Sequence, residues 1–83
     1  MSNLGKALAH DYATMGFATL AGENGLQSFD GKHLVELGDA SSSGEKDDRL
    51  DIFVDGTLAE SIDYDDKDFN SKLILALAEP LNF

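Results

Sequence analysis

The dipeptide Asp55-Gly56, which lies between two stretches of alternating polar and apolar residues, is the strongest local folding signal in this chain. Asp-Gly in this setting is typical of a tight β-hairpin, because the central residues of such a turn take positive φ angles. The pattern predicts one strand over residues 49–55 and a returning strand over residues 57–63. The apolar residues of the first strand share one face: Leu50, Ile52 and Val54.

Two registers of this hairpin are open, and they differ in which side chains face each other. A two-residue loop places Asp51 opposite Glu60, and like charges that face each other across a strand pair are unfavourable. A three-residue loop with a bulge gives apolar pairs instead, namely Val54 with Leu58 and Leu50 with Ile62. We prefer this second register because it gathers the apolar residues on one face. It leaves Phe53 on the opposite face, either covered by a helix or exposed for a partner.

A helix is expected at the N-terminal end of the chain, over residues 3–21, with Ser2 or Asn3 as its N-cap. Its apolar residues recur at helical spacing: Leu4, Leu8, Tyr12 and Met15. The stretch 14–20 also fits a strand, and Gly22 is available to end the helix.

A second helix is expected over residues 66–78, with Asp66 or Asp68 as its N-cap at the positive end of the helix dipole. Its apolar stripe consists of Phe69, Leu73, Ala76 and Leu77, widened by Ile74, Leu75 and Ala78. The width of the stripe predicts a well-buried helix. Pro80 is expected to stop the helix at Glu79.

The segment between the helices completes the prediction of the fold. Residues 22–25 form a turn, residues 26–29 are ambiguous, and a turn at residues 30–31 precedes a strand over 33–37. A polar loop follows over residues 38–48. The expected fold is α+β, with a small antiparallel sheet of two to four strands flanked by an N-terminal and a C-terminal helix. All 83 residues are expected to form a single domain.

The charge of the chain is concentrated in its middle. Sixteen acidic and six basic residues give a net charge of −10, beyond the magnitude of about 2–8 that suits a small domain. Residues 1–22 and 69–83 each carry one acid and one base, so the whole net charge lies in residues 23–68. Two clusters of acids are the predicted partner-binding residues: Glu45, Asp47, Asp48, Asp51 and Asp55, then Glu60, Asp63, Asp65, Asp66 and Asp68. They are interpreted either as a solvated face that aids solubility or as a surface that meets positive charge.

Enzymatic chemistry is not expected from this sequence. The absence of cysteine removes disulfides, thiolate metal sites and cysteine nucleophiles together. His10 and His33 lack the spacing of metal ligands, and serines 41–43 lie in a polar loop with no adjacent base. Neither a P-loop nor a dinucleotide-binding fingerprint is present. We therefore expect no catalytic residue and no cofactor.

Two further motifs are approached but not completed. An EF-hand frame that starts at Asp66 has Ser71 where glycine is needed and Leu77 where glutamate is needed. The acid clusters can still bind divalent cations weakly. Residues 36–42 come near the serine motif of acyl-carrier proteins, but they lack its Asp-Ser-Leu core.

The charge and the hydropathy pattern limit the partners. Negative charge of this size repels nucleic-acid phosphates and anionic lipid headgroups, so direct nucleic-acid binding and membrane binding are not expected. The longest apolar run, residues 73–78, is far shorter than the roughly 20 residues that span a bilayer, and no signal-peptide pattern is present. We expect a cytoplasmic protein that binds a basic protein surface.

Carboxylates on such a chain can stand in for phosphates. Alternate side chains on one face of a strand are about 6.6 Å apart, which is similar to the separation of neighbouring phosphates along a nucleic-acid strand. With acid clusters at residues 45–55 and 60–68 on a short chain, the protein resembles the small acidic inhibitors of phages and mobile elements, which include anti-CRISPR proteins and other DNA mimics. The resemblance implies an inhibitor that acts in the host cytoplasm on the basic surface of a nucleic-acid-binding protein or complex, such as a CRISPR effector.

A second hypothesis comes from the apolar residues. In this interpretation the chain is an adaptor, an immunity-type partner or a structural subunit that binds through Phe53, Leu81 and Phe83, and its acids serve solubility. Leu81 and Phe83 can instead dock on the core. Self-association into a homodimer through residues 73–83 is compatible with either hypothesis.

Overall fold

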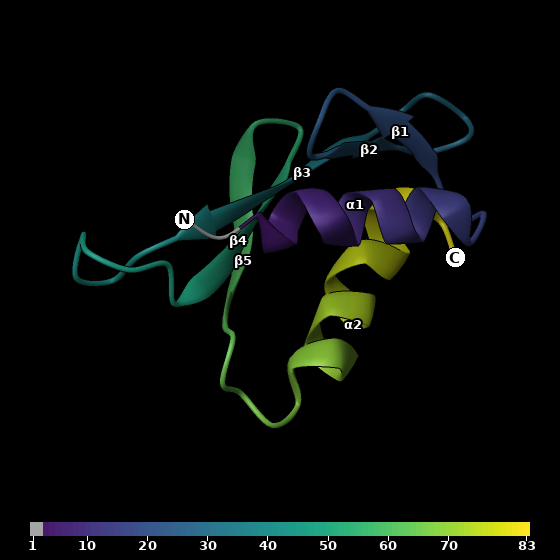
Figure 1. Cartoon of the computed structure of the whole chain (residues 1–83). Coiled ribbons are helices and arrows are strands. Elements are labelled where there is room, and N and C mark those ends of the chain that lie inside the picture. The colour runs from purple at the N-terminus through teal and green to yellow at the C-terminus, as the bar shows by residue number, and fades with distance from the viewer. Residues whose placement is uncertain (1–2) are drawn as a thin grey trace.

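The chain forms one helix, five strands and a second helix, in that order. The computed structural model describes residues 3–83. The elements are α1 (Leu4–Thr14), β1 (Thr19–Ala21), β2 (Gly25–Gln27), β3 (Leu34–Ala40), β4 (Arg49–Val54), β5 (Thr57–Asp63) and α2 (Phe69–Leu81). The strands form one antiparallel sheet in chain order, and both helices lie on the same side of it (Figure 1). The α+β class and the two terminal helices are confirmed. The sheet has five strands instead of the predicted two to four.

The additional strand, β1, comes from the end of the predicted first helix, where the sequence also fits a strand over residues 14–20. Helix α1 stops at Thr14 because Gly16, with φ of 88°, takes the left-handed conformation that favours glycine. The N–H groups of Gly16 and Phe17 then donate to the carbonyls of Ala13 and Tyr12, which closes the helix as a Schellman motif. The chain is thereby free to form β1, and the predicted helical end at Gly22 is wrong.

The middle of the chain also carries more strand than expected. The ambiguous segment contributes to β2, which pairs with β3, and the turn around Asp30-Gly31 connects these two strands. Strand β3 continues through Ala40, because residues 38–40 pair with β4. The predicted polar loop over 38–48 is therefore shortened to residues 41–48.

The β4–β5 hairpin combines features of both registers that the sequence left open. The turn is the two-residue form, since Val54 pairs with Thr57, and the predicted pairing of Val54 with Leu58 is wrong. The register then shifts between Ile52 and Phe53, and this irregularity restores the predicted pairing of Leu50 with Ile62. The hairpin therefore follows the two-residue register next to the turn and the preferred register beyond the shift.

The shift in register removes the repulsion that a regular two-residue hairpin would contain. Asp51 faces Ser61 instead of Glu60, and the Ser61 hydroxyl donates to Asp51 Oδ1 at 2.6 Å. The bulge thus replaces a pair of like charges with a hydrogen bond.

The core lies between the sheet and the two helices. Helix α1 packs on β1, β2 and β3, and α2 packs on β3 and β5. The largest buried side chains are Leu26, Val35, Leu37, Leu50, Ile52, Ile62, Leu73, Leu77 and Leu81. Phe53 lies on the opposite face from Ile52 and is half-buried, so neither helix covers it. The expectation that α2 is well buried is wrong on its outer side, where Leu75 is 75% exposed, because α2 has a neighbour on one side only.

Helix α2 runs past the residue that was expected to stop it. Pro80 lies in the last turn and is buried, and the helix spans Phe69–Leu81 instead of the predicted residues 66–78. Asn82 takes a φ of 64° and the N–H of Phe83 donates to the Ala78 carbonyl, so a left-handed residue ends this helix as well. One lost N–H donor is tolerated in a last turn that is closed in this way.

Leu81 docks on the core, in agreement with one of the two predicted alternatives, whereas Phe83 packs on other aromatic rings and stays 42% exposed. Leu81 is 2% exposed. The ring of Phe83 lies against Phe17, with ring centroids 4.6 Å apart, and near Tyr12, with centroids 6.4 Å apart. These contacts join the end of the chain to α1 and to the segment that leads into β1.

Helix α1 meets the sheet through small residues. Its buried residues are Gly5, Ala9 and Tyr12, while Leu4 and Met15 of the predicted stripe are exposed. A Cβ atom at Gly5 would lie 2.4 Å from the carbonyl oxygen of Leu37 in β3, which is closer than real Cβ contacts come. The helix backbone therefore rests directly on the backbone of β3.

We expect Gly5→Ala to lower the free energy of unfolding by about 2 kcal/mol, because the clash with β3 outweighs the gain of about 1 kcal/mol in helix propensity. Urea denaturation would measure the change. Gly38→Ala is the matched control, since no atom lies within 4 Å of a Cβ atom added there, and it should change stability by less than about 0.5 kcal/mol. Equal stability of the two variants would contradict the close packing of α1.

Candidate functional site

The structure brings residues of both acid clusters together at one end of the sheet. Asp47 and Asp48 from the β3–β4 loop line a shallow depression with Asp63 at the end of β5 and Asp65 after it. These four residues are called the acidic end below. The depression is completed by Ser42, Lys46 and Tyr64. A backbone bond of 3.0 Å from the Tyr64 N–H to the Asp48 carbonyl holds the two segments side by side.

Tyr64 is the centre of the acidic end. Its hydroxyl donates to Asp39 Oδ1, and its ring packs on Phe69 with centroids 5.6 Å apart. Burial raises the pKa of Tyr64 far above its usual value, and the bond to Asp39 and the charges of Asp39, Asp47 and Asp51 raise it further.

Three carboxylates of the acidic end have no side-chain partner in the part of the chain that the structure describes. Within residues 3–83, the side chains of Asp47, Asp63 and Asp65 make no hydrogen bond or ion pair. Asp48 instead shapes its own loop, because its Oδ1 accepts from the N–H and the hydroxyl of Ser42 at 3.0 and 3.2 Å. Glu45 is exposed in the same loop. The loop that carries Asp47 is thus held in place by the neighbouring Asp48.

Other predicted acids serve the local structure. Asp51 lies 3.4 Å from Arg49 Nε, in addition to its bond from Ser61. Asp66 accepts from the Lys72 ammonium and from the Asp68 N–H, and these two bonds lower its pKa. Asp68 is the N-cap residue of α2, although its side chain makes no capping bond. Their charges add to the negative potential near the acidic end, but the carboxylates of Asp51 and Asp66 are already paired.

Two of the ten predicted acids lie apart from the acidic end. Asp55 is at the other end of β4, where its carboxylate binds His33 Nδ1 at 2.7 Å and the Leu34 N–H at 2.9 Å. The bond with His33, followed by the bond from Leu34, lowers the pKa of Asp55. Glu60 pairs with Ile52, which places it on the helix side of β5 beside α2. The ten predicted acids therefore do not form one continuous surface.

Sequence reasoning missed the two residues that organise the acidic end. Asp39 accepts hydrogen bonds from the Tyr64 hydroxyl and, at 3.0 Å, from the N–H of Gly5. The sequence does not reveal this role, because the pattern around residue 39 predicts a polar loop, whereas the residue lies in β3. The role of Tyr64 could have been predicted, because an aromatic residue between two acids, Asp63 and Asp65, follows directly after a predicted strand.

The chain was compared with protein families, curated proteins and solved structures. No protein-family model, curated protein or solved structure matches the chain. Among the described residues 3–83, no group of three or more histidine, cysteine or acidic residues is arranged to hold a metal ion. In the same part of the chain, no helix has the length and hydropathy needed to cross a membrane.

We expect Tyr64→Phe to lower the free energy of unfolding at pH 8 by about 2 kcal/mol, because it removes a hydrogen bond to a charged group. A raised pKa in the folded state stabilises the fold fully below the ordinary tyrosine pKa of about 10, and this contribution is lost as the pH rises above that value. The wild type should therefore lose more stability than Tyr64→Phe between about pH 9 and pH 11. Urea denaturation across this range would measure it, and parallel pH profiles would refute the role of Tyr64.

Proposed function

We propose that this chain is an inhibitor that binds, through its acidic end, a basic surface that a nucleic-acid-binding protein or complex uses for DNA or RNA. The observation that carries the proposal is the convergence of three unpaired carboxylates, Asp47, Asp63 and Asp65, from two segments around Tyr64. In its narrowest form the proposal is an anti-CRISPR-type inhibitor that acts in the cytoplasm of a host cell.

The distribution of paired and unpaired acids supports binding over solubility alone. Charge that serves only solubility can be spread over any surface. Here Lys46 is the one base among the described residues that line the depression, and the loops that carry the free carboxylates are held by Asp48 and Tyr64. A fixed set of like charges costs stability through repulsion, and a basic partner would relieve that cost.

The mechanism that we propose is competition by charge. Carboxylates on adjacent loops would occupy the positions of nucleic-acid phosphates in a basic groove, and the net charge of −10 would steer the encounter. Tyr64 adds an aromatic side chain of the kind that is enriched at protein interfaces. Association should therefore be fast at low salt and weaken as the ionic strength rises.

The alternative is an adaptor or structural subunit that binds through Phe53, Leu81 and Phe83, and it has less support than the acidic end. Leu81 is buried in the core, and the ring of Phe83 packs on Phe17 but stays 42% exposed. Phe53 remains, half-buried on the open face of the sheet and paired with Leu58, which is 52% exposed. Of the residues first named for this alternative, an apolar partner would contact Phe53, together with Leu58, and the exposed side of Phe83.

We expect the neutralised variant Asp47→Asn, Asp63→Asn, Asp65→Asn to lose the partners that the wild type captures. The immobilised wild type, exposed to a host lysate at low salt, should retain nucleic-acid-binding proteins and release them at moderate salt. The purified partner should then bind its DNA or RNA more weakly when the chain is added. Mass spectrometry of the salt-gradient fractions and a competition titration would measure both effects.

The matched control is Asp11→Asn, Glu23→Gln, Glu36→Gln, which removes three negative charges from exposed residues outside the acidic end. It should capture the same partners as the wild type. If both variants lost their partners equally, binding would depend on net charge and not on the acidic end. Partners that resist high salt would point to apolar contacts and would overturn the proposal.

A further inference from the structure

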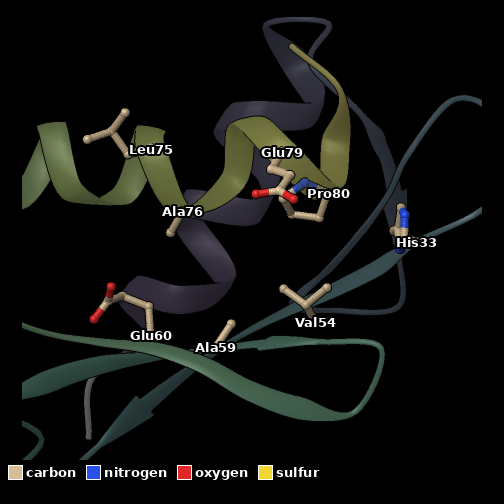
Figure 2. Close-up of a pocket in the computed structure, with 8 residues that line it drawn as sticks. All are labelled: His33, Val54, Ala59, Glu60, Leu75, Ala76, Glu79 and Pro80. Atoms are coloured by element: carbon tan, nitrogen blue, oxygen red, sulfur yellow. The ribbon is translucent and has the colours of Figure 1, made fainter.

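A groove runs between the free edge of the sheet and helix α2, away from the acidic end. It encloses about 380 Å³, within the range of roughly 300–1,000 Å³ that is typical of binding pockets. Figure 2 shows Ala59 and Glu60 of β5 facing Ala76 and Glu79 of α2 across it. We call this the β5–α2 groove, and it is lined by His33, Val54, Ala59, Glu60, Leu75, Ala76, Glu79 and Pro80.

The groove lies beside an unpaired strand edge. Within residues 3–83, β5 pairs with β4 alone and is the last strand of the sheet. The N–H of Ser61 donates at 3.2 Å to the side chain of Glu60 and not to a strand. An edge of seven residues with unpaired backbone groups can add a further strand from another chain.

The chemistry of the groove selects one kind of strand. Its floor is apolar, formed by Val54, Ala59 and Ala76, and its charged groups are the carboxylates of Glu60 and Glu79. His33 also lines the groove, but its Nδ1 is held by Asp55 at 2.7 Å. The carboxylates therefore lack a basic partner within the groove lining and would attract lysine or arginine.

A second copy of this chain is a poor occupant. Pairing of β5 with β5 of another molecule would bring Glu60 and Asp63 of each copy close to the same carboxylates of the other. The net charge of −10 on each molecule opposes the same approach at longer range. Charge complementarity thus favours a basic segment over self-association.

We infer that the β5–α2 groove binds an extended basic segment of a partner protein, which pairs with β5 as a sixth strand and places an apolar side chain between Ala59 and Ala76. Lysine or arginine side chains on the same face of that segment contact Glu60 and Glu79. This site uses residues outside the acidic end, so it does not rest on the function proposed above.

The test is titration of the isotope-labelled protein with a synthetic peptide, followed by amide chemical shifts in NMR spectra. The seven-residue probe has threonine at its odd positions and lysine, leucine and lysine at its even positions, which puts both bases and the apolar side chain on one face. We expect shifts confined to residues 57–63 and 75–80 and to the other two lining residues, His33 and Val54. A peptide with glutamate in place of lysine, and one methylated at alternate backbone amides, should each bind at least tenfold more weakly.

The variant Glu60→Gln, Glu79→Gln should weaken binding of the lysine probe about tenfold, because two exposed ion pairs are lost. The control Asp47→Asn, Asp65→Asn removes the same charge at the acidic end and should bind like the wild type. Shifts that map to residues 41–48, or equal binding of the glutamate peptide, would overturn the inference. So would the same shifts on raising the protein concentration without peptide, which would make a second copy the occupant.

Discussion

The contact between the backbone of α1 and the backbone of β3 determines how the rest of the molecule is arranged. It exists because residue 5 has no side chain, so the helix comes within hydrogen-bonding distance of Asp39. The same carboxylate accepts from Tyr64, in the segment that leads from β5 to α2. One acidic residue in β3 therefore fixes the start of the first helix and the approach to the second.

The acids of this protein fall into two groups with different roles. Asp39, Asp48, Asp55 and Asp66 accept hydrogen bonds from groups that are distant in the chain or across a turn, and they hold loops and helix ends in place. Asp47, Asp63 and Asp65 make no such bond: Asp48 fixes the loop that carries Asp47, and Asp39 holds Tyr64 between Asp63 and Asp65. Net charge alone hides this distinction, which depends on the donors that the fold brings to each carboxylate.

The sequence predicts which helices and strands form better than it predicts the residues at which they begin and end. The Asp55-Gly56 hairpin, the two helices and the Leu50–Ile62 pairing all follow from short-range patterns. The end of α1 at Thr14 was missed because the φ angle of Gly16, a glycine inside a helical pattern, shows only in the folded chain. Asp39 was missed for a related reason, since its donors, Gly5 and Tyr64, are 34 and 25 residues away along the chain.

The order of the strands in the sheet has a consequence for the kinetics of folding. Each strand pairs with the strand next to it in the chain, so the sheet can form by successive closure of short loops, which is fast. The contacts that span most of the chain are those of Phe83 with Phe17 and Tyr12. Closure of the aromatic cluster should therefore be a late event in folding, and the two ends of the chain should be the first parts to separate when the protein opens.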